Sequence, residues 1–163
     1  IDFLRKNESK TLEFKESLRG GGIGEPKYPE WRVSRAIAAF ANTEGGTLLI
    51  GVHDDGSAVG IDSDFASVNG GQDEYQLRLN QVIDTAFGKG FTPTHIDITF
   101  HEVESLSVCR VDVKRSKDPI FLGSVKKKGN QFWVRNSGQT NELEDSDLAL
   151  YVKDHFCSPS KEL

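Results

Sequence analysis

Hydrophobic residues recur along this chain with the spacings of both strands and helices. In Lys10–Lys15, Leu12 and Phe14 alternate with Glu13, which is typical of a strand with one face against a core. We therefore expect Glu13 to point away from the core, into solvent. The continuous apolar run Thr47–Val52 predicts a central strand that is covered on both faces.

Three strand pairs are predicted from alternating hydrophobic residues and the turns between them. The first turns at Asp54-Asp55-Gly56 and returns over Ala58–Ile61. The second pair is expected at residues 96–100 with 106–113, and the third at 120–125 with 131–135. In the strand 106–113 the inward-facing positions shift by one residue, which predicts a bulge near Cys109 or Arg110.

Three segments carry apolar residues at helical spacing and predict amphipathic helices at Glu30–Thr43, Asp73–Phe87 and Asp145–Phe156. The segment Arg19–Glu30 holds four glycines and two prolines, which predict a mobile loop. It lacks the Gly-Lys-Ser/Thr of a phosphate-binding loop. Strands that alternate with helices and end in hairpins predict an α+β fold with a mixed, largely antiparallel sheet and flanking helices.

A length of 163 residues with 36% hydrophobic content suits one packed domain. We expect it to cover residues 1–157, with 158–163 as a tail or linker to a missing region. The sequence opens at Ile1 and contains no methionine, which indicates a piece of a longer protein with further domains. The absence of a membrane-length apolar run or a signal-like start predicts a soluble, cytoplasmic protein, with Cys109 and Cys157 as reduced thiols.

Charge is distributed unevenly along the chain. The whole sequence has a net charge of −5, yet residues 110–135 contain eight cationic and two anionic side chains. This block therefore carries +6, and the rest of the chain carries −11. A basic block can be an ordinary solvated face, but it is also what binding to phosphate groups requires.

Three stretches of sequence are more specific in combination than any one of them alone. They are ESKTLEFK (Glu8–Lys15), AFANTEGGTLLIGVHDDGSAVG (Ala39–Gly60) and FWVRNSGQT (Phe132–Thr140). In this order and spacing they resemble the Schlafen-type AlbA-2 (Alba-like) nucleic-acid-binding domain, from Glu8 to about Phe156. The resemblance implies a Schlafen/AlbA-2-like fold within a larger prokaryotic regulatory or defence protein.

The resemblance also implies a set of three carboxylates, because Schlafen nucleases cut structured RNA with three acids. These positions fall on Glu8, Glu13 and Asp54, a set that suits Mg²⁺ or Mn²⁺. Residues five apart in one strand face opposite sides, so Glu8 joins Glu13 only if the chain bends between them. His53 replaces a residue that is commonly acidic in relatives. Solvent-exposed acids and an ordinary tight turn explain the same residues without a metal.

Nucleic-acid contacts are predicted mainly on the late hairpins, where cations would meet backbone phosphates. Trp133 and Arg135 are expected to share one face of a strand, so that Trp133 either stacks on an unpaired base or packs under the glycine-rich loop. The full predicted set is Lys15, Arg115, Lys117, Lys126, Lys127, Lys128, Trp133, Arg135 and Thr140.

Three functions are consistent with this sequence. The first is a nucleic-acid-binding module, for RNA or DNA. The second is a metal-dependent endoribonuclease that uses the three carboxylates. The third is a ligand-sensing or dimerisation module, and a single domain of this kind could form a homodimer to build a groove.

Overall fold

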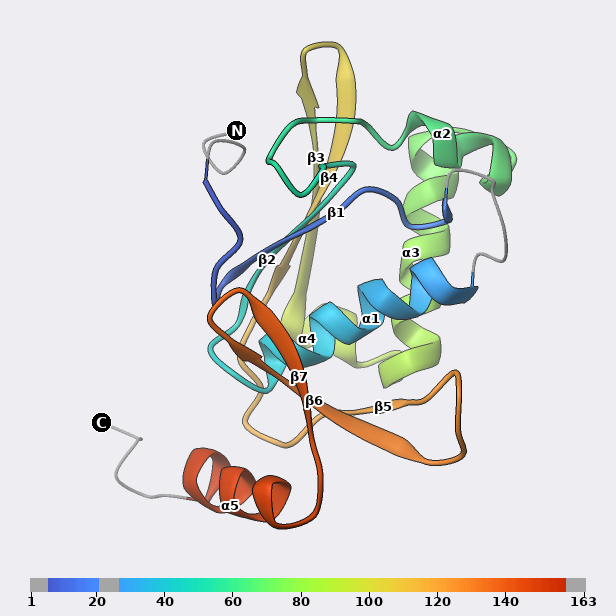
Figure 1. Cartoon of the computed structure of the whole chain (residues 1–163). Helices are drawn as coiled ribbons and strands as arrows, with labels where there is room; N and C mark the ends of the chain where they lie inside the picture. The colour runs from blue at the N-terminus through green and yellow to red at the C-terminus, as the bar shows by residue number, and fades with distance from the viewer. Residues whose placement is uncertain (1–5, 21–26, 158–163) are drawn as a thin grey trace.

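Two β-sheets and three long helices make up the described part of the chain, residues 6–20 and 27–157 of a computed structural model (Figure 1). The first sheet has the spatial order β1 (Leu12–Lys15), β2 (Gly46–Ile50), β4 (Leu106–Val113) and β3 (Ile96–Val103). β1 and β2 run parallel, whereas the other neighbours are antiparallel. The α+β class and the mixed, largely antiparallel sheet are thereby confirmed. The tail 158–163 and the middle of the predicted loop Arg19–Glu30 lie outside the described residues.

The second sheet is a separate antiparallel one, and the sequence predicted only part of it. It consists of β5 (Phe121–Gly123), β6 (Asn130–Asn136) and β7 (Gln139–Leu143) in that order. β5 and β6 form the predicted late hairpin. β7 was not predicted, because its sequence QTNEL has a single hydrophobic residue. Backbone pairing with β6 makes it a strand.

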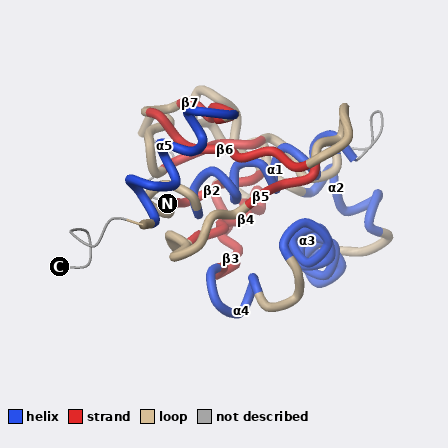
Figure 2. Tube along the Cα trace, turned by 90° about the horizontal axis from the view of Figure 1, so that it is seen from below, coloured by secondary structure: helices blue, strands red, loops and turns tan. Residues whose placement is uncertain are grey.

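The three predicted helices are confirmed as α1 (Lys27–Ala41), α3 (Gln72–Phe87) and α5 (Asp145–Phe156). α1 lies between the two sheets (Figures 1 and 2). α5 packs on the second sheet, where the rings of Tyr151 and Phe156 contact that of Phe132 on β6. Three short helices were not predicted: α2 (Asp62–Phe65), η3 (Ala66–Val68) and α4 (Phe91–His95). Each is too short to show a helical period in its sequence.

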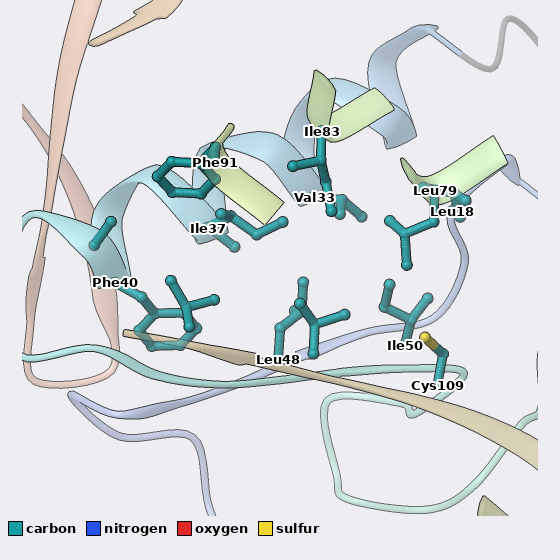
Figure 3. Close-up of a cluster of buried hydrophobic side chains, with 14 of the residues drawn as sticks. Leu18, Val33, Ile37, Phe40, Leu48, Ile50, Leu79, Ile83, Phe91 and Cys109 are labelled. Carbon is teal, nitrogen blue, oxygen red and sulfur yellow. The ribbon is translucent and has the colours of Figure 1, made fainter. Parts of the chain in front are cut away.

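The main hydrophobic core lies between the first sheet and helices α1 and α3 (Figure 3). Leu48 of β2, Ile37 of α1 and Ile83 of α3 belong to it and are fully buried. On the other face of the sheet, Leu49 packs in a second cluster with Phe14. Adjacent residues of β2 are thus buried on opposite sides, which confirms the predicted central strand.

The predicted bulge in β4 is wrong. Cys109 pairs with Ile50 of β2 and Phe100 of β3, and Arg110 continues both ladders without an inserted residue. Val108 is buried in the second cluster and Cys109 in the main core. The shift of hydrophobic phase therefore arises because β4 is covered on both faces.

The residues after α1 connect it to the second sheet. Asn42 is fully buried, and its Nδ2 donates to the carbonyl oxygens of Ile120 (2.8 Å) and Trp133 (3.0 Å). Its Oδ1 accepts from the Ile120 N–H at 2.8 Å. Thr43 Oγ1 accepts from the N–H of Arg135 at 2.9 Å. These bonds satisfy backbone groups that neither sheet pairs by itself.

Within residues 6–20 and 27–157, no helix has both the length and the apolar composition needed to cross a bilayer. Cys109 is buried and Cys157 is exposed, and both are free thiols as expected. Burial raises the pKa of the Cys109 thiol, so this side chain acts as a small core hydrophobe.

Replacing Asn42 by alanine is expected to destabilise the protein strongly. The substitution leaves two carbonyls and one N–H without partners at a buried junction, and each such group costs about 1–3 kcal/mol. We expect a decrease on the order of 3 kcal/mol in the free energy of unfolding, measured by urea denaturation. Alanine at the exposed Asn130 is the matched control and should change stability by less than about 0.5 kcal/mol. Equal effects of the two substitutions would contradict the role assigned to Asn42.

Candidate nucleic-acid interface and carboxylate positions

An ion pair between Glu13 of β1 and Arg135 of β6 joins the two sheets. Arg135 Nη1 bonds Glu13 Oε2, and the side chains are 0% and 10% exposed, respectively. Nη1 also donates to Thr140 Oγ1 at 2.9 Å. Nη2 donates to the carbonyl oxygens of Ser9 and Leu12. The guanidinium lies over the ring of Phe40, 5.1 Å from its centroid.

These contacts correct two expectations about surface exposure. Glu13 does point away from the Leu12 and Phe14 cluster, as its strand position predicts, but the second sheet covers it there. Arg135 shares the face of Trp133 that the alternation predicts, but this face lies against α1. Neither charged group is therefore presented to solvent. The hydroxyl of Thr140, which was predicted to contact nucleic acid, accepts a hydrogen bond from Arg135.

Glu8 and Asp54 meet at a hollow beside the turn between β6 and β7. The hollow measures about 600 Å³, and its lining includes both acids, Asn136 and Gln139. The chain bends before β1, as predicted, so that Glu8 Oε1 accepts from the Phe14 N–H at 2.9 Å. Burial raises the pKa of Glu8, and the negative charges of Glu13 and Asp54 raise it further, while the bond from Phe14 opposes them.

The three predicted carboxylates do not fit a metal site in this arrangement. Glu13 is absent from the lining of the hollow, and its two oxygens are already bonded to Lys15 Nζ (2.6 Å) and Arg135. Among residues 6–20 and 27–157, no three His, Cys, Asp or Glu side chains are placed to hold an ion together. Glu8 and Asp54 are near one another, but Glu13 serves the ion pair between the sheets.

The predicted phosphate-binding lysines of the last hairpin lie away from this hollow. Lys126, Lys127 and Lys128 are exposed on the loop between β5 and β6, whereas the hollow lies at the other end of β6. With 7 residues in β6, this separation is about 20 Å. Arg115 and Lys117 are also exposed, and Arg115 donates to the carbonyl oxygen of His155 at 3.0 Å. The lysines of this loop are therefore not placed beside Glu8 and Asp54.

Trp133 packs against two residues of α1 that the sequence did not single out. Its ring lies edge-on to Trp31, with 5.9 Å between centroids. The guanidinium carbon of Arg35 lies 5.2 Å from the Trp31 centroid and 5.1 Å from that of Trp133. Trp31 Nε1 also donates to the Gly123 carbonyl oxygen at 2.8 Å. An aromatic residue and an arginine four positions apart on one helix face are the sequence signal for this cluster.

Substitution of Glu13 by glutamine is expected to destabilise the fold by about 3–5 kcal/mol, because it leaves the charge of Arg135 buried without a counter-charge. Alanine at Lys15, the other partner of Glu13, is the control. Lys15 is partly exposed, so its removal should cost at most about 1 kcal/mol. Urea denaturation of both variants provides the measurement, and a Glu13 variant as stable as the wild type would rule out this role.

Substitution of Glu8 by glutamine is expected to leave stability at neutral pH unchanged or increased. Because the folded-state pKa of Glu8 is raised, its protonated form favours folding, and this contribution is lost as the pH rises through the folded pKa. Glutamine retains the acceptor for Phe14 without the charge. Any advantage of the variant should vanish below the ordinary pKa of 4.5. Denaturation curves across this pH range test the sign, and a variant less stable only at neutral pH would contradict it.

Comparison with known proteins identifies relatives of this chain and of its fold. The sequence profile of the family described as "Schlafen, AlbA_2" matches residues 8–144. The DIP2311 protein of Corynebacterium diphtheriae has a similar structure, with a TM-score of 0.61 and 18% identity over 90% of this chain. That alignment spans 27% of the larger protein.

A second similar structure is the N-terminal domain of a protein from Nitrosomonas europaea, named as related to the ATP-dependent DNA helicase RecG. It aligns with a TM-score of 0.50 and 18% identity, over 89% of this chain and 91% of that domain. At these identities both structures support the fold alone. The profile match, in contrast, covers most of the sequence, and the chain therefore belongs to the Schlafen AlbA_2 family.

Proposed function

We propose that this chain is a nucleic-acid-binding module whose exposed cations contact backbone phosphates. The observation that carries the proposal is the lysine loop, defined as Lys126–Lys128 between β5 and β6. All three side chains are exposed. Within the described part of the chain, only Lys127 of the three has carboxylate partners, Glu144 at 3.2 Å and Glu142 at 3.9 Å. Unpaired ammonium groups on a loop suit phosphates without preference for sequence.

The relatives support a role connected with nucleic acid. Membership of the Schlafen AlbA_2 family agrees with it, and so does the helicase-related name of the Nitrosomonas europaea protein. Because DIP2311 is much longer than the aligned part, we propose that the module serves a larger regulatory or defence protein. RNA and DNA are both suitable ligands, because backbone phosphates are common to them.

Nuclease activity gains no support from the carboxylates. Glu13 is engaged with Arg135 and lies outside the hollow that Glu8 and Asp54 share. A ligand-sensing or dimerisation role is the alternative, and a protein that binds no nucleic acid at micromolar concentration would favour it. Light scattering on the same protein tests the homodimer.

Replacing the three lysines of the lysine loop by glutamine is expected to weaken binding and its dependence on salt. Each phosphate that the protein no longer neutralises lowers the slope of log K against log salt by about 0.7–0.9. If the lysine loop neutralises two or three phosphates, the substitutions reduce the slope by about two. Gel-shift titrations with single-stranded and duplex oligonucleotides at several salt concentrations provide both quantities.

The matched control replaces Lys10, Lys89 and Lys153, which are exposed elsewhere on the molecule. Both triple variants have the same net charge, so a difference between them reports position. If the control weakens binding as much as the variant of the lysine loop does, the loop is not the interface. If the wild type binds neither oligonucleotide, the proposed function itself fails.

A further inference from the structure

Arg35 differs from most arginines of the described chain in its partners. Arg19 and Arg78 both bond Glu30, Arg110 bonds Asp112, and Arg135 bonds Glu13. The guanidinium of Arg35 makes no hydrogen bond or ion pair within residues 6–20 and 27–157 and instead lies over the rings of Trp31 and Trp133. A guanidinium has five N–H donors in its plane, and an indole nitrogen is a donor only, so neither ring offers these donors a nitrogen acceptor.

The position of Arg35 is unfavourable for a lone cation. Its side chain is partly buried, and this burial lowers its pKa, as does the charge of Arg32 one turn earlier on α1. The negative charge of Glu13 acts in the opposite direction, but that carboxylate is bonded to Lys15 and Arg135. Cation–π contacts with two indoles offset part of the cost. The remaining donors suit an anion from solution.

The surroundings of Arg35 favour an anion over a neutral ligand. Arg32 is exposed on α1, close enough to disfavour the charge of Arg35. Lys15 and Arg135 converge on the single carboxylate of Glu13. Two arginines of α1 therefore lie together with no carboxylate bonded to either of them in the described part of the chain. An anion placed between them would be attracted by both charges.

We propose that Arg35 and Arg32 form a binding site for a phosphate group, in which Trp31 and Trp133 hold the Arg35 guanidinium in place. The planar N–H fork of arginine matches two phosphate oxygens, and contact with two nearly perpendicular indole rings restricts the movement of that fork before the ligand arrives. Trp133 then serves as a support for Arg35, in place of the base-stacking role considered from the sequence. The identity of the ligand as a backbone phosphate rests on the proposed function, whereas the affinity for phosphate does not.

Intrinsic fluorescence reports on this site directly, because Trp31 and Trp133 are the 2 tryptophans of the sequence. The full chain is titrated at low salt with oligothymidylate in one series and with inorganic phosphate in another, under tryptophan-selective excitation. We expect a saturable change in emission with the oligonucleotide, at the concentrations that give a gel shift. Substitution R35K retains the charge but removes the fork, and should weaken this response about tenfold.

Two further variants keep the test decisive. Arg32 is exposed, so R32K is expected to fold whatever R35K does, and it should weaken the response several-fold. R110K changes an arginine on β4 in the same conservative way and is expected to bind as the wild type does. Thermal melting establishes that each variant is folded before it is titrated.

The outcomes separate this site from the proposed function. A gel shift without any change in tryptophan emission, or R35K and R32K binding as tightly as the wild type, overturns the phosphate site and leaves the proposed function standing. Emission that responds to inorganic phosphate without a gel shift supports the phosphate site and overturns nucleic acid as its ligand. A response to oligonucleotide that is weakened in both arginine variants and retained in R110K supports both proposals.

Discussion

The Arg135–Glu13 ion pair is the constraint on which the arrangement of the two sheets depends. Desolvating a guanidinium costs several kcal/mol, which only a nearby carboxylate and well-placed acceptors offset. Here the acceptors are Glu13, Thr140 and the carbonyls of Ser9 and Leu12. They come from both sheets, so the charge is compensated only when β6 lies against β1. A contact of this kind specifies one packing among the many that hydrophobic burial alone would allow, which is a role that buried ion pairs have in some proteins.

The stretches that identify the family converge on the same junction. Glu13 lies in the first stretch and Arg135 in the third, and the second contains Asn42, whose side chain bonds the connection to β5 and the strand β6. Gly45 of that stretch has a φ of +76°, and a Cβ there would lie 2.6 Å from the Val113 carbonyl oxygen, so the position requires glycine. The sequence signature thus records the geometry that joins the layers, and this is why it identifies the fold better than it identifies an activity.

Local pattern was sufficient for the elements whose burial is regular. Hydrophobic spacing predicted the positions of three helices and one strand, namely α1, α3, α5 and β2. Each helix packs through one face, whereas β2 is buried on both faces. β7 lacked such a pattern and forms through pairing with β6. The alternation of polar and apolar residues predicted the correct strand face for Glu13 and for Trp133. It did not predict that other elements bury these faces, because a strand's sequence does not encode which distant element packs on it. The pairing of Arg35 with Trp133 depends on the same long-range packing.

The burial of Glu13 changes what the presence of this acid says about the chain. Folding alone is enough to retain a carboxylate that compensates the arginine of β6. In this chain Glu13 is needed for folding whether or not a phosphodiester is cut. Glu13 therefore marks the junction between two layers of this fold, and any chemistry of this chain has to be sought in side chains that the fold itself does not need.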